Sequence, residues 1–438
     1  MQSAREMGAS RSGIIETLAE NGFREPVLVR MLDYTIGLFE SRGLGEDYYG
    51  YHNIHHELAV TYVMLLSACS KDNPSDLSDS DVKHLYAAAL LHDFDPLKSV
   101  DKPHEKRVIN FISSNPPIVS MMEEAGISLP LVKALILRTT YPWRGEGRRR
   151  AQQQMAACFA DVDATRDNPP MQEHYERLGH YLSVVDRIGG YALGDFVHSM
   201  ELAKMNAHAL AWTPSVIVRR SVGYFEDLLN NEAETFKMVM GSLPRAMRKN
   251  FFDTVLSFMH LRSREISIQA DYTYDNLRLV PTIDTMETRQ DPSFVSSLLS
   301  IFDELPRPLQ FGRDTFKESV ADPEVILNTL RLNDGRVIGF AKGGSLEHYT
   351  LSPEIRDSNF GLYNTVFLEP LALRMGYWGL GGGSKMRHLF VMQSYSKRFT
   401  YLTSFALRAV IKSRVGKEQA EFVKKIDPER WDYYRMRL

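Results

Sequence analysis

The sequence predicts a multi-domain protein that joins an all-α part to an α+β part. Three observations lead to this fold class. The chain has 438 residues, which predicts two to three domains at roughly 150 residues each. Hydrophobic residues show helical spacing over the first 270 residues, and strand-like segments begin near residue 272. We therefore expect a helical domain over residues 1–270 and a mixed α/β domain over residues 271–438.

The helical part is indicated by mainly apolar runs separated by polar breaks. Leu85–Leu91 and Val132–Leu137 are runs typical of buried helices. Breaks rich in Asp, Asn, Ser and Pro, such as residues 73–76 and 115–117, separate such segments. Helical spacing continues over residues 225–265. We therefore expect helices throughout the first domain.

The second part mixes strand and helix signals. Residues 276–280 alternate before a proline, which indicates a strand, and residues 294–305 return to helical spacing. Residues 336–341 follow an Asn-Asp-Gly turn and predict a further strand. A long apolar stretch over residues 363–373 leads into a glycine-rich loop and then a helix. This order predicts an α/β or α+β domain.

Composition excludes several classes of protein. Lys and Arg number 52 and Asp and Glu number 55, and a net charge of −3 is not that of a general nucleic-acid binder. No uncharged apolar run in the sequence approaches the ~18 residues of a membrane-spanning helix. The cysteines, Cys69 and Cys158, lack metal-site or disulfide spacing, so we expect a reducing compartment, the cytoplasm.

The strongest chemical signal is a set of histidines and aspartates on apolar segments. His52 and His56 are four residues apart, so they share one face of a helix. His92 and Asp93 are adjacent after an apolar run, and Asp186 lies in a third apolar segment. Ionised carboxylates are rarely placed on apolar faces without compensation. Two imidazoles and two carboxylates suit a divalent metal: Mn, Fe, Co, Ni or Zn, or Mg with more water ligands.

The order of these residues resembles the HD superfamily of metal-dependent phosphohydrolases over about residues 25–210. That family has a His, an adjacent His-Asp pair and a distant Asp as metal ligands, which match His56, His92, Asp93 and Asp186. The segment around His52 is similar to a helix of cyclic-nucleotide phosphodiesterases, whose matching His protonates the leaving oxygen. The resemblance implies metal-dependent hydrolysis of a small phosphoester or nucleotide-like substrate.

One departure concerns the number of metal ions. The phosphodiesterase motif continues His-Asp-x-Asp-His, and here Pro96 replaces the second His. We therefore expect one metal ion, as in the nucleotidase branch of the superfamily. That branch carries acids after the His-Asp pair that position water, and Asp95 and Asp101 are the candidates here. A metal site is favoured over a degenerate relic of the fold.

The second chemical signal is the glycine-rich loop over residues 376–384. Backbone N–H groups at such a helix start bind phosphate, and glycine permits close approach or a positive φ. The loop matches neither the dinucleotide-binding fingerprint nor the Walker pattern. It resembles motif A of the GCN5-related N-acetyltransferases, the GNAT family, over about residues 274–438. The glycines of Arg/Gln-x-x-Gly-x-Gly/Ala match Gly379 and Gly381, while Gly376 stands at the Arg/Gln position.

This resemblance implies acetyl-CoA or another acyl-CoA as the cofactor. It also implies strands near residues 399–407 and 431–438. Glu369 precedes the loop and is the candidate general base through water, with Tyr395 and Tyr401 as candidate acids. The residues expected to bind the cofactor lie at the loop and the helix start: Leu373, Gly379, Leu380, Gly381, Gly382, Gly383 and Ser384.

Three interpretations stay open. The first is a bifunctional enzyme, a phosphohydrolase fused to a GNAT-like acyltransferase. In the second, only the acyltransferase is active and the helical domain is regulatory or structural. In the third, the helical domain is an HD-type diiron oxygenase, which needs extra ligands such as His52, His55 or His104. No membrane or nucleic-acid partner is expected, an oligomer stays open, and Arg148–Arg150 is expected to be a solvated run or to lie over an anionic substrate.

Overall fold

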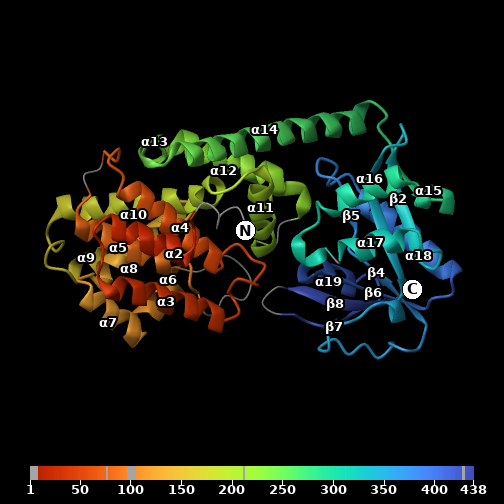
Figure 1. Ribbon diagram of the computed structural model, residues 1–438, viewed down its shortest axis with the longest axis horizontal. Helices are drawn as coiled ribbons and strands as arrows, with labels where there is room; N and C mark the ends of the chain where they lie inside the picture. Colours follow the sequence, from red (N-terminus) through yellow and green to blue (C-terminus); the bar gives the residue numbers. More distant parts are fainter. Residues whose placement is uncertain (1–7, 75–76, 96–104, 211–212, 311, 427–429) are drawn as a thin grey trace. The chain divides into compact units, whose positions relative to one another are not determined.

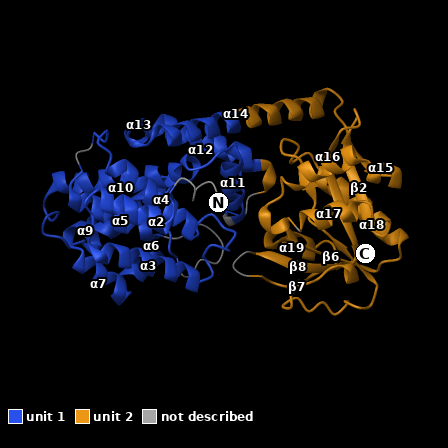
Figure 2. Ribbon diagram, in the orientation of Figure 1, with its two compact units in different colours: residues 1–212, 216–259 blue, residues 213–215, 260–438 orange. Residues whose placement is uncertain are grey.

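The computed structural model describes residues 8–74, 77–95, 105–210, 213–310, 312–426 and 430–438. The chain forms two compact units, seen along the chain in Figure 1 and coloured separately in Figure 2. Unit 1 comprises residues 1–212 and 216–259, and unit 2 comprises residues 213–215 and 260–438. The division lies inside helix α14 (Arg245–Tyr274), N-terminal to the boundary expected at residue 270. Because this helix contains no glycine or proline, the sequence carries no local signal at the division.

Every regular element in the described part of unit 1 is helical, as the sequence predicts (Figure 1). A 3₁₀ turn (Pro214–Val216) precedes α12, and α14 continues into unit 2. The α-helices that come before α14 are α2 (Arg11–Glu20), α3 (Pro26–Ser41), α4 (Ile54–Ala68), α5 (Asp79–Leu91), α6 (Glu105–Ser113), α7 (Pro116–Glu124), α8 (Leu129–Arg138), α9 (Gly145–Ala160), α10 (Pro169–Ala192), α11 (Phe196–Ala209), α12 (Ile217–Asn231) and α13 (Ala233–Ser242).

Helices α4, α5 and α10 pack against one another in the interior of unit 1. Helix α5 is buried around nearly its whole circumference, with Leu85, Ala87 and Leu90 fully buried. A helix that is hydrophobic on all sides belongs in a protein core. A capping box between Ser78 and Asp81 fixes its first turn. This packing places the polar residues at the end of α5 against α4 and α10.

The described residues of unit 2 form a mixed eight-stranded sheet in the order β1-β2-β3-β4-β6-β8-β7, with β5 pairing with β3. Strands β4 and β6 run parallel, and the other neighbouring strands run antiparallel. The strands are β1 (Leu279–Ile283), β2 (Ile326–Leu332), β3 (Val337–Ser345), β4 (Thr365–Leu368), β5 (Ala372–Leu373), β6 (Tyr401–Leu407), β7 (Ala420–Lys424) and β8 (Trp431–Arg437).

Helices cover both faces of this sheet. Phe340 of β3 packs against Phe316 of α17 (Arg313–Val320), beside α16 (Pro292–Phe302). The next residue of the strand, Ala341, points to the opposite face, where α18 (Gly382–Ser396) contributes Met386 and Phe390. Two short helices, α15 (Met286–Gln290) and α19 (Arg408–Val415), complete the unit. The predicted combination of an α part and an α+β part is therefore confirmed.

Strands β1, β3, β6 and β8 lie where the sequence predicts strands, within a few residues. Strand β2 was not expected, because polar residues interrupt its hydrophobic pattern. Asn328 and Thr329 are nevertheless fully buried. The Thr329 hydroxyl donates to Asp284 at 2.8 Å, and the Asn328 amide donates to Gln393 at 3.0 Å. These long-range partners make a polar strand acceptable in the core, and local sequence does not reveal them.

The long strand expected over residues 363–373 is two strands, β4 and β5. After Leu368, the Glu369 N–H donates to the Lys342 carbonyl, and Pro370 has no N–H to continue the ladder. The chain then pairs with β3 again at Ala372. The interruption brings the glycine-rich loop out at the end of β5.

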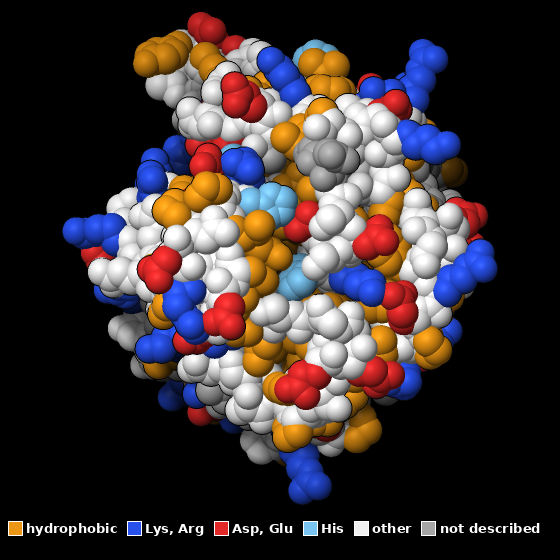
Figure 3. Space-filling view, turned by 90° about the vertical axis from the view of Figure 1, so that its left-hand side faces the viewer, with side chains coloured by type: hydrophobic (Ala, Val, Ile, Leu, Met, Phe, Trp, Pro, Cys, Tyr) orange, Lys and Arg blue, Asp and Glu red, His pale blue; other side chains and the backbone are white. Residues whose placement is uncertain are grey.

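No helix among the described residues is long and apolar enough to cross a membrane. On the face drawn in Figure 3, basic and acidic side chains are interspersed and do not gather into a patch of one sign. Histidine side chains reach the surface beside hydrophobic ones near the centre of this face. Interspersed charge agrees with the net charge of −3.

Candidate functional site

Four residues distant in sequence meet in the interior of unit 1. His56 lies in the first turn of α4, His92 is the C-cap residue of α5 and is followed by Asp93, and Asp186 lies in α10. One ligand-type atom from each of these side chains lies within 4.8 Å of the others. The structure therefore brings together all four residues that the sequence nominates as metal ligands, and we call this group the His-Asp cluster.

The imidazole nitrogens face the carboxylates across a small central space. His56 Nε2 lies 3.2 Å from Asp93 Oδ2 and 3.0 Å from Asp186 Oδ1. His92 Nε2 lies 3.5 Å from the same two oxygens. Neither Nε2 atom has a hydrogen bond of good geometry within the described residues, although both are buried. Buried nitrogens without hydrogen bonds, facing two carboxylates, are what a cation-binding site requires.

Local sequence explains how His56 reaches this position. Asn53 caps α4, because its Oδ1 accepts from the His56 N–H at 3.1 Å. The Asn53 amide donates to the carbonyls of Tyr48 and Gly50, which ties the cap to the preceding turn. His56 therefore occupies a fixed place in the first turn of the helix, with the Tyr51 ring 4.6 Å away between centroids.

A fully buried carboxylate, Glu57, supports the cluster and is absent from the sequence prediction. Its Oε2 lies 2.9 Å from His92 Nδ1, and its Oε1 accepts from the Asp93 N–H at 3.1 Å. The Ala89 carbonyl lies at the same distance, 2.9 Å, from His92 Nδ1, so Ala89 and Glu57 together orient the imidazole with Nε2 toward the cluster. Burial raises the pKa of Glu57. Burial lowers that of His92, but Glu57 and Asp93 outweigh it and raise the pKa of His92 well above its ordinary value. The available sequence signal was an acid directly after His56 on an apolar helix.

The electrostatics of the cluster favour positive charge. Burial lowers the pKa of His56, but Asp186 and Asp93 outweigh it and raise that pKa to about 9. Burial raises the pKa of both aspartates, yet His92 holds that of Asp93 well below its usual range, and His56 and His92 do the same for Asp186. Two carboxylates thus stay ionised beside two protonated imidazoles. A divalent cation carries the same charge as those two protons, so the residues fit such an ion.

His52 lies at the edge of the cluster, as its sequence position predicts. Its Nε2 is 3.7 Å from Asp93 Oδ2, and its ring is perpendicular to that of His56 at 5.8 Å between centroids. The Tyr51 ring contacts it edge-on at 5.0 Å. His52 is therefore beside the four ligand-type residues and is not one of them.

The two acids expected to orient water have different outcomes. Asp95 is fully buried, and its Oδ2 lies 2.9 Å from Arg107 Nε, so its carboxylate is engaged in an ion pair. Asp101 and His104 lie outside the described residues. Arg149 and Arg150 are exposed on α9, and both lie beside Glu146. Their placement agrees with the solvated interpretation of this basic run.

The glycine-rich loop of unit 2 forms the start of α18. Gly379 has φ +84° and Gly381, the N-cap, has φ +78°, which residues with a Cβ rarely adopt. A Cβ on Gly379 would lie 2.9 Å from Ser215 Cβ, and one on Gly382 would lie 2.5 Å from Leu330. No side chain in the described part of the chain caps this helix. Its first-turn N–H groups, including those of Gly383 and Ser384, are therefore placed to receive an anion.

The apolar members of the expected cofactor set support this loop. Leu373 ends β5 and packs on the core, and Leu380 is buried in it. The Trp378 indole donates to the Leu373 carbonyl at 2.7 Å. These contacts hold the loop against the sheet.

Glu369, the expected general base, is buried in a network of its own. Its Oε1 accepts hydrogen bonds from Lys342 and, at 2.9 Å, from the Tyr349 hydroxyl. Burial raises the pKa of Tyr349 far above its ordinary value, and Glu369 adds to this effect. Two protein donors therefore already occupy this carboxylate. The candidate acids lie elsewhere: Tyr395 is exposed on α18, and Tyr401 begins β6.

No family model matches this chain, and neither does any curated protein. Solved acetyltransferase structures align with parts of it. The N-acetyltransferase YhbS from Escherichia coli, in complex with CoA, covers 37% of this chain and 82% of its own at 13% identity and a TM-score of 0.27. GCN5 from Tetrahymena covers 37% and 96% at 14% identity and a TM-score of 0.26. An N-acetyltransferase from Staphylococcus aureus Mu50 covers 37% and 98% at 16% identity and a TM-score of 0.27.

TM-scores this low carry no argument about function. The fold of unit 2 therefore rests on its own strand order and loop, and the HD and GNAT resemblances stay predictions.

Proposed function

We propose that unit 1 is a metal-dependent phosphohydrolase of the HD type. The observation that carries this proposal is the convergence of His56, His92, Asp93 and Asp186, whose ligand atoms lie within 4.8 Å of one another. Two imidazole nitrogens and two carboxylate oxygens suit one Mn, Fe, Co, Ni or Zn ion. The substrate is a small phosphoester or a nucleotide-like compound.

Each residue then has a defined task. A divalent ion held by the cluster supplies a more acidic water and stabilises charge on a phosphoryl oxygen. Glu57 keeps the His92 ring turned toward the cluster. His52, 3.7 Å from Asp93, holds a proton for the leaving oxygen. As the phosphorus–oxygen bond to the leaving group breaks, water forms the new bond, and the products are an alcohol and phosphate.

The test is elemental analysis of the purified full chain, followed by a phosphoester screen with the metal that is found. About one divalent ion per chain and metal-dependent phosphate release are the expected results. Two irons per chain, with oxygen consumption and no phosphate release, would replace the proposal by diiron oxygenase chemistry. A chain that takes up no metal after reconstitution would leave unit 1 with a structural or regulatory role.

We propose a second activity for unit 2, transfer of an acyl group from acyl-CoA. The supporting observation is the uncapped start of α18, with left-handed glycines at 379 and 381, directly after β4 and β5. Backbone N–H groups in this arrangement bind the phosphates of a cofactor. Calorimetry with CoA and acetyl-CoA tests binding, and release of free CoA in the presence of a panel of amines tests transfer. Absence of CoA binding would exclude this activity.

A further inference from the structure

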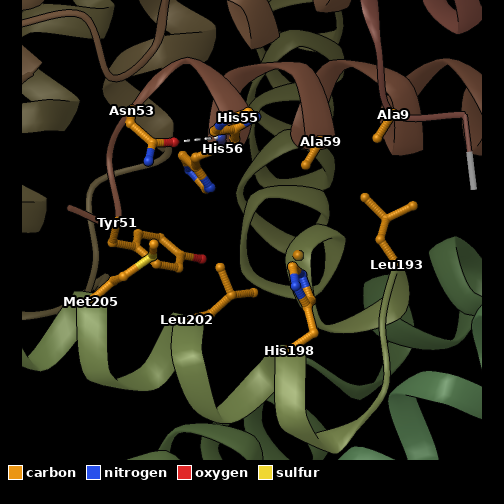
Figure 4. A pocket seen from close by; sticks show the side chains of 11 residues that line it. Ala9, Tyr51, Asn53, His55, His56, Ala59, Leu193, His198, Leu202 and Met205 are labelled. Carbon is orange, nitrogen blue, oxygen red and sulfur yellow. Dashed lines mark hydrogen bonds between the residues drawn. The ribbon is translucent and has the colours of Figure 1, made fainter. Parts of the chain in front are cut away.

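A pocket beside the His-Asp cluster is formed by α4, α10, α11, the turn before α4 and Ala9 ahead of α2, all within unit 1 (Figure 4). The hollow encloses about 530 Å³, part of which is open to solvent. Its hydrophobic walls are Ala9, Tyr51, Ala59, Leu193, Leu202 and Met205.

Among the described residues, the polar lining of this pocket consists of an amide and imidazoles. Its polar side chains within the described part of the chain are Asn53, His55, His56 and His198, and none of the described Lys, Arg, Asp or Glu residues lines it. The Asn53 side chain is already used for hydrogen bonds to backbone groups around the start of α4. Arg and Lys, the usual ligands of phosphate, are absent from the walls that the structure describes. The pocket therefore suits a neutral and mainly apolar group.

One polar atom in the pocket is available to a ligand. Tyr51 is 8% exposed, and its hydroxyl oxygen points into the space between Leu202, His198 and Ala59 in Figure 4. Within the described residues, this hydroxyl has no hydrogen-bond partner. A hydroxyl that faces the pocket can donate a hydrogen bond to a ligand atom placed there.

The pocket and the cluster share a wall. His56 lines the pocket and also faces Asp93 and Asp186, and the Tyr51 ring packs on its imidazole at 4.6 Å. A molecule whose phosphoryl group lies at the cluster would therefore extend its organic group past His56 into the pocket. We propose that this pocket binds the apolar organic group of the phosphoester, and that Tyr51 donates a hydrogen bond to an oxygen of that group. This inference rests on the phosphohydrolase function proposed above, and it identifies the substrate class as esters of small apolar alcohols, not sugar or polyol phosphates.

The first test compares two inert phosphonates on the metal-loaded full chain by calorimetry. Phenylphosphonate should bind at least about tenfold more tightly than methylphosphonate, because only the phenyl ring occupies the pocket. Leu202→Trp, which fills the pocket from α11, should abolish this preference. Val197→Trp is the matched control, because Val197 is 75% exposed on the same helix and does not line the pocket. If Leu202→Trp does not fold, Ala59→Leu fills the pocket from α4. Equal binding of the two probes by the wild type, or an unchanged preference in the filled variant, would overturn the proposal.

The second test isolates the Tyr51 hydroxyl. Phenoxymethylphosphonate has an ether oxygen where 2-phenylethylphosphonate has a methylene group. Tyr51→Phe keeps the ring against His56 and removes only the hydroxyl. It should weaken binding of the ether about three- to tenfold and leave the methylene analogue unchanged. Equal effects on both probes, or no effect on either, would remove Tyr51 from the proposal.

A third measurement separates this proposal from the phosphohydrolase assignment. Benzyl alcohol, a product-like probe without phosphate, should bind to the metal-free chain and to Val197→Trp but not to Leu202→Trp, as followed by NMR. Failure of the wild type to release phosphate from any ester would refute the hydrolase function while this result stood. Absence of benzyl alcohol binding, with metal-dependent hydrolysis intact, would refute the pocket proposal alone.

Discussion

The two candidate sites are built from different parts of the chain. The His-Asp cluster of unit 1 uses side chains from three helices that meet in a core. The glycine-rich site of unit 2 uses backbone N–H groups at one helix start, and its glycines matter because they lack side chains. A side-chain site therefore depends on packing between distant segments, whereas a backbone site depends on the conformation of one short loop. The two should respond to substitution independently.

The largest effect is expected for Asp93→Ala. This change removes one ligand and leaves two buried imidazoles with a single carboxylate. Metal binding and hydrolysis should fall by more than the about 10- to 100-fold that changes behind the ligands cost. Elemental analysis and phosphate release measure both effects, and CoA affinity should stay at its wild-type value. Retention of stoichiometric metal would show that the cluster is not the metal site.

Glu57→Gln should have the next largest effect. The amide has nearly the same shape, but it loses the charge that holds His92 at Nδ1. We expect metal affinity to fall about 10- to 100-fold, as for other groups that orient a ligand. Competition with a chelating dye gives the affinity. Glu40→Gln serves as a control, because it makes the same exchange on α3, away from the cluster. A wild-type affinity in Glu57→Gln would reduce this residue to a packing role.

Gly379→Val tests the backbone site. A β-branched residue at φ +84° is strained, and its Cβ would approach Ser215 to 2.9 Å. CoA affinity measured by calorimetry should fall about tenfold or more, which corresponds to about 1.4 kcal/mol. Gly416→Ala is the control in unit 2, since an added Cβ there meets open space. Undiminished CoA binding by Gly379→Val would exclude the loop as the phosphate site, and metal content should not change in either variant.

The smallest effect is expected for Arg149→Ala. Its guanidinium is exposed and, among the described residues, pairs with Glu146 one turn away. The free energy of unfolding, obtained from thermal denaturation, should change by no more than about 0.5 kcal/mol, the usual range for exposed positions. Hydrolysis should equal that of the wild type. A clear rise in KM for a phosphoester would instead favour the alternative in which this basic run lies over an anionic substrate.

Much of the cluster could be anticipated because its chemistry is unusual for an apolar helix. Histidines and aspartates within hydrophobic runs are rare enough to stand out, and their order supplied the ligand set. The role of Glu57 was not predicted, because an acid beside a histidine at a helix start is usually an ordinary solvated residue. Only the packing of α4 against α5 shows that it is buried beside His92. The pocket could not be predicted for a similar reason: no sequence signal links Leu202 and Met205 of α11 to Tyr51.

In unit 2, strands with regular alternation could be predicted, whereas those shaped by tertiary partners could not. Asn328 and Thr329 interrupt β2 in the sequence but donate hydrogen bonds to Gln393 and Asp284. The break after Leu368 depends on pairing with β3 as well as on Pro370. The glycine positions were readable because positive φ is a local property. The partner of Glu369 could not be predicted from local sequence, because Lys342 lies on another strand.

Glu57 contacts two of the ligand-type residues, His92 and Asp93, and so couples their positions. One of its oxygens contacts the His92 ring, which the Ala89 carbonyl also contacts, and the other accepts from the Asp93 N–H. Loss of this carboxylate would therefore loosen a pair of ligands without altering any of the four residues that a motif search inspects. A chain can keep the complete ligand pattern and still bind metal poorly. When related sequences are sorted into active and inactive members, the residue aligned with Glu57 should be inspected first, beside the four ligand-type residues.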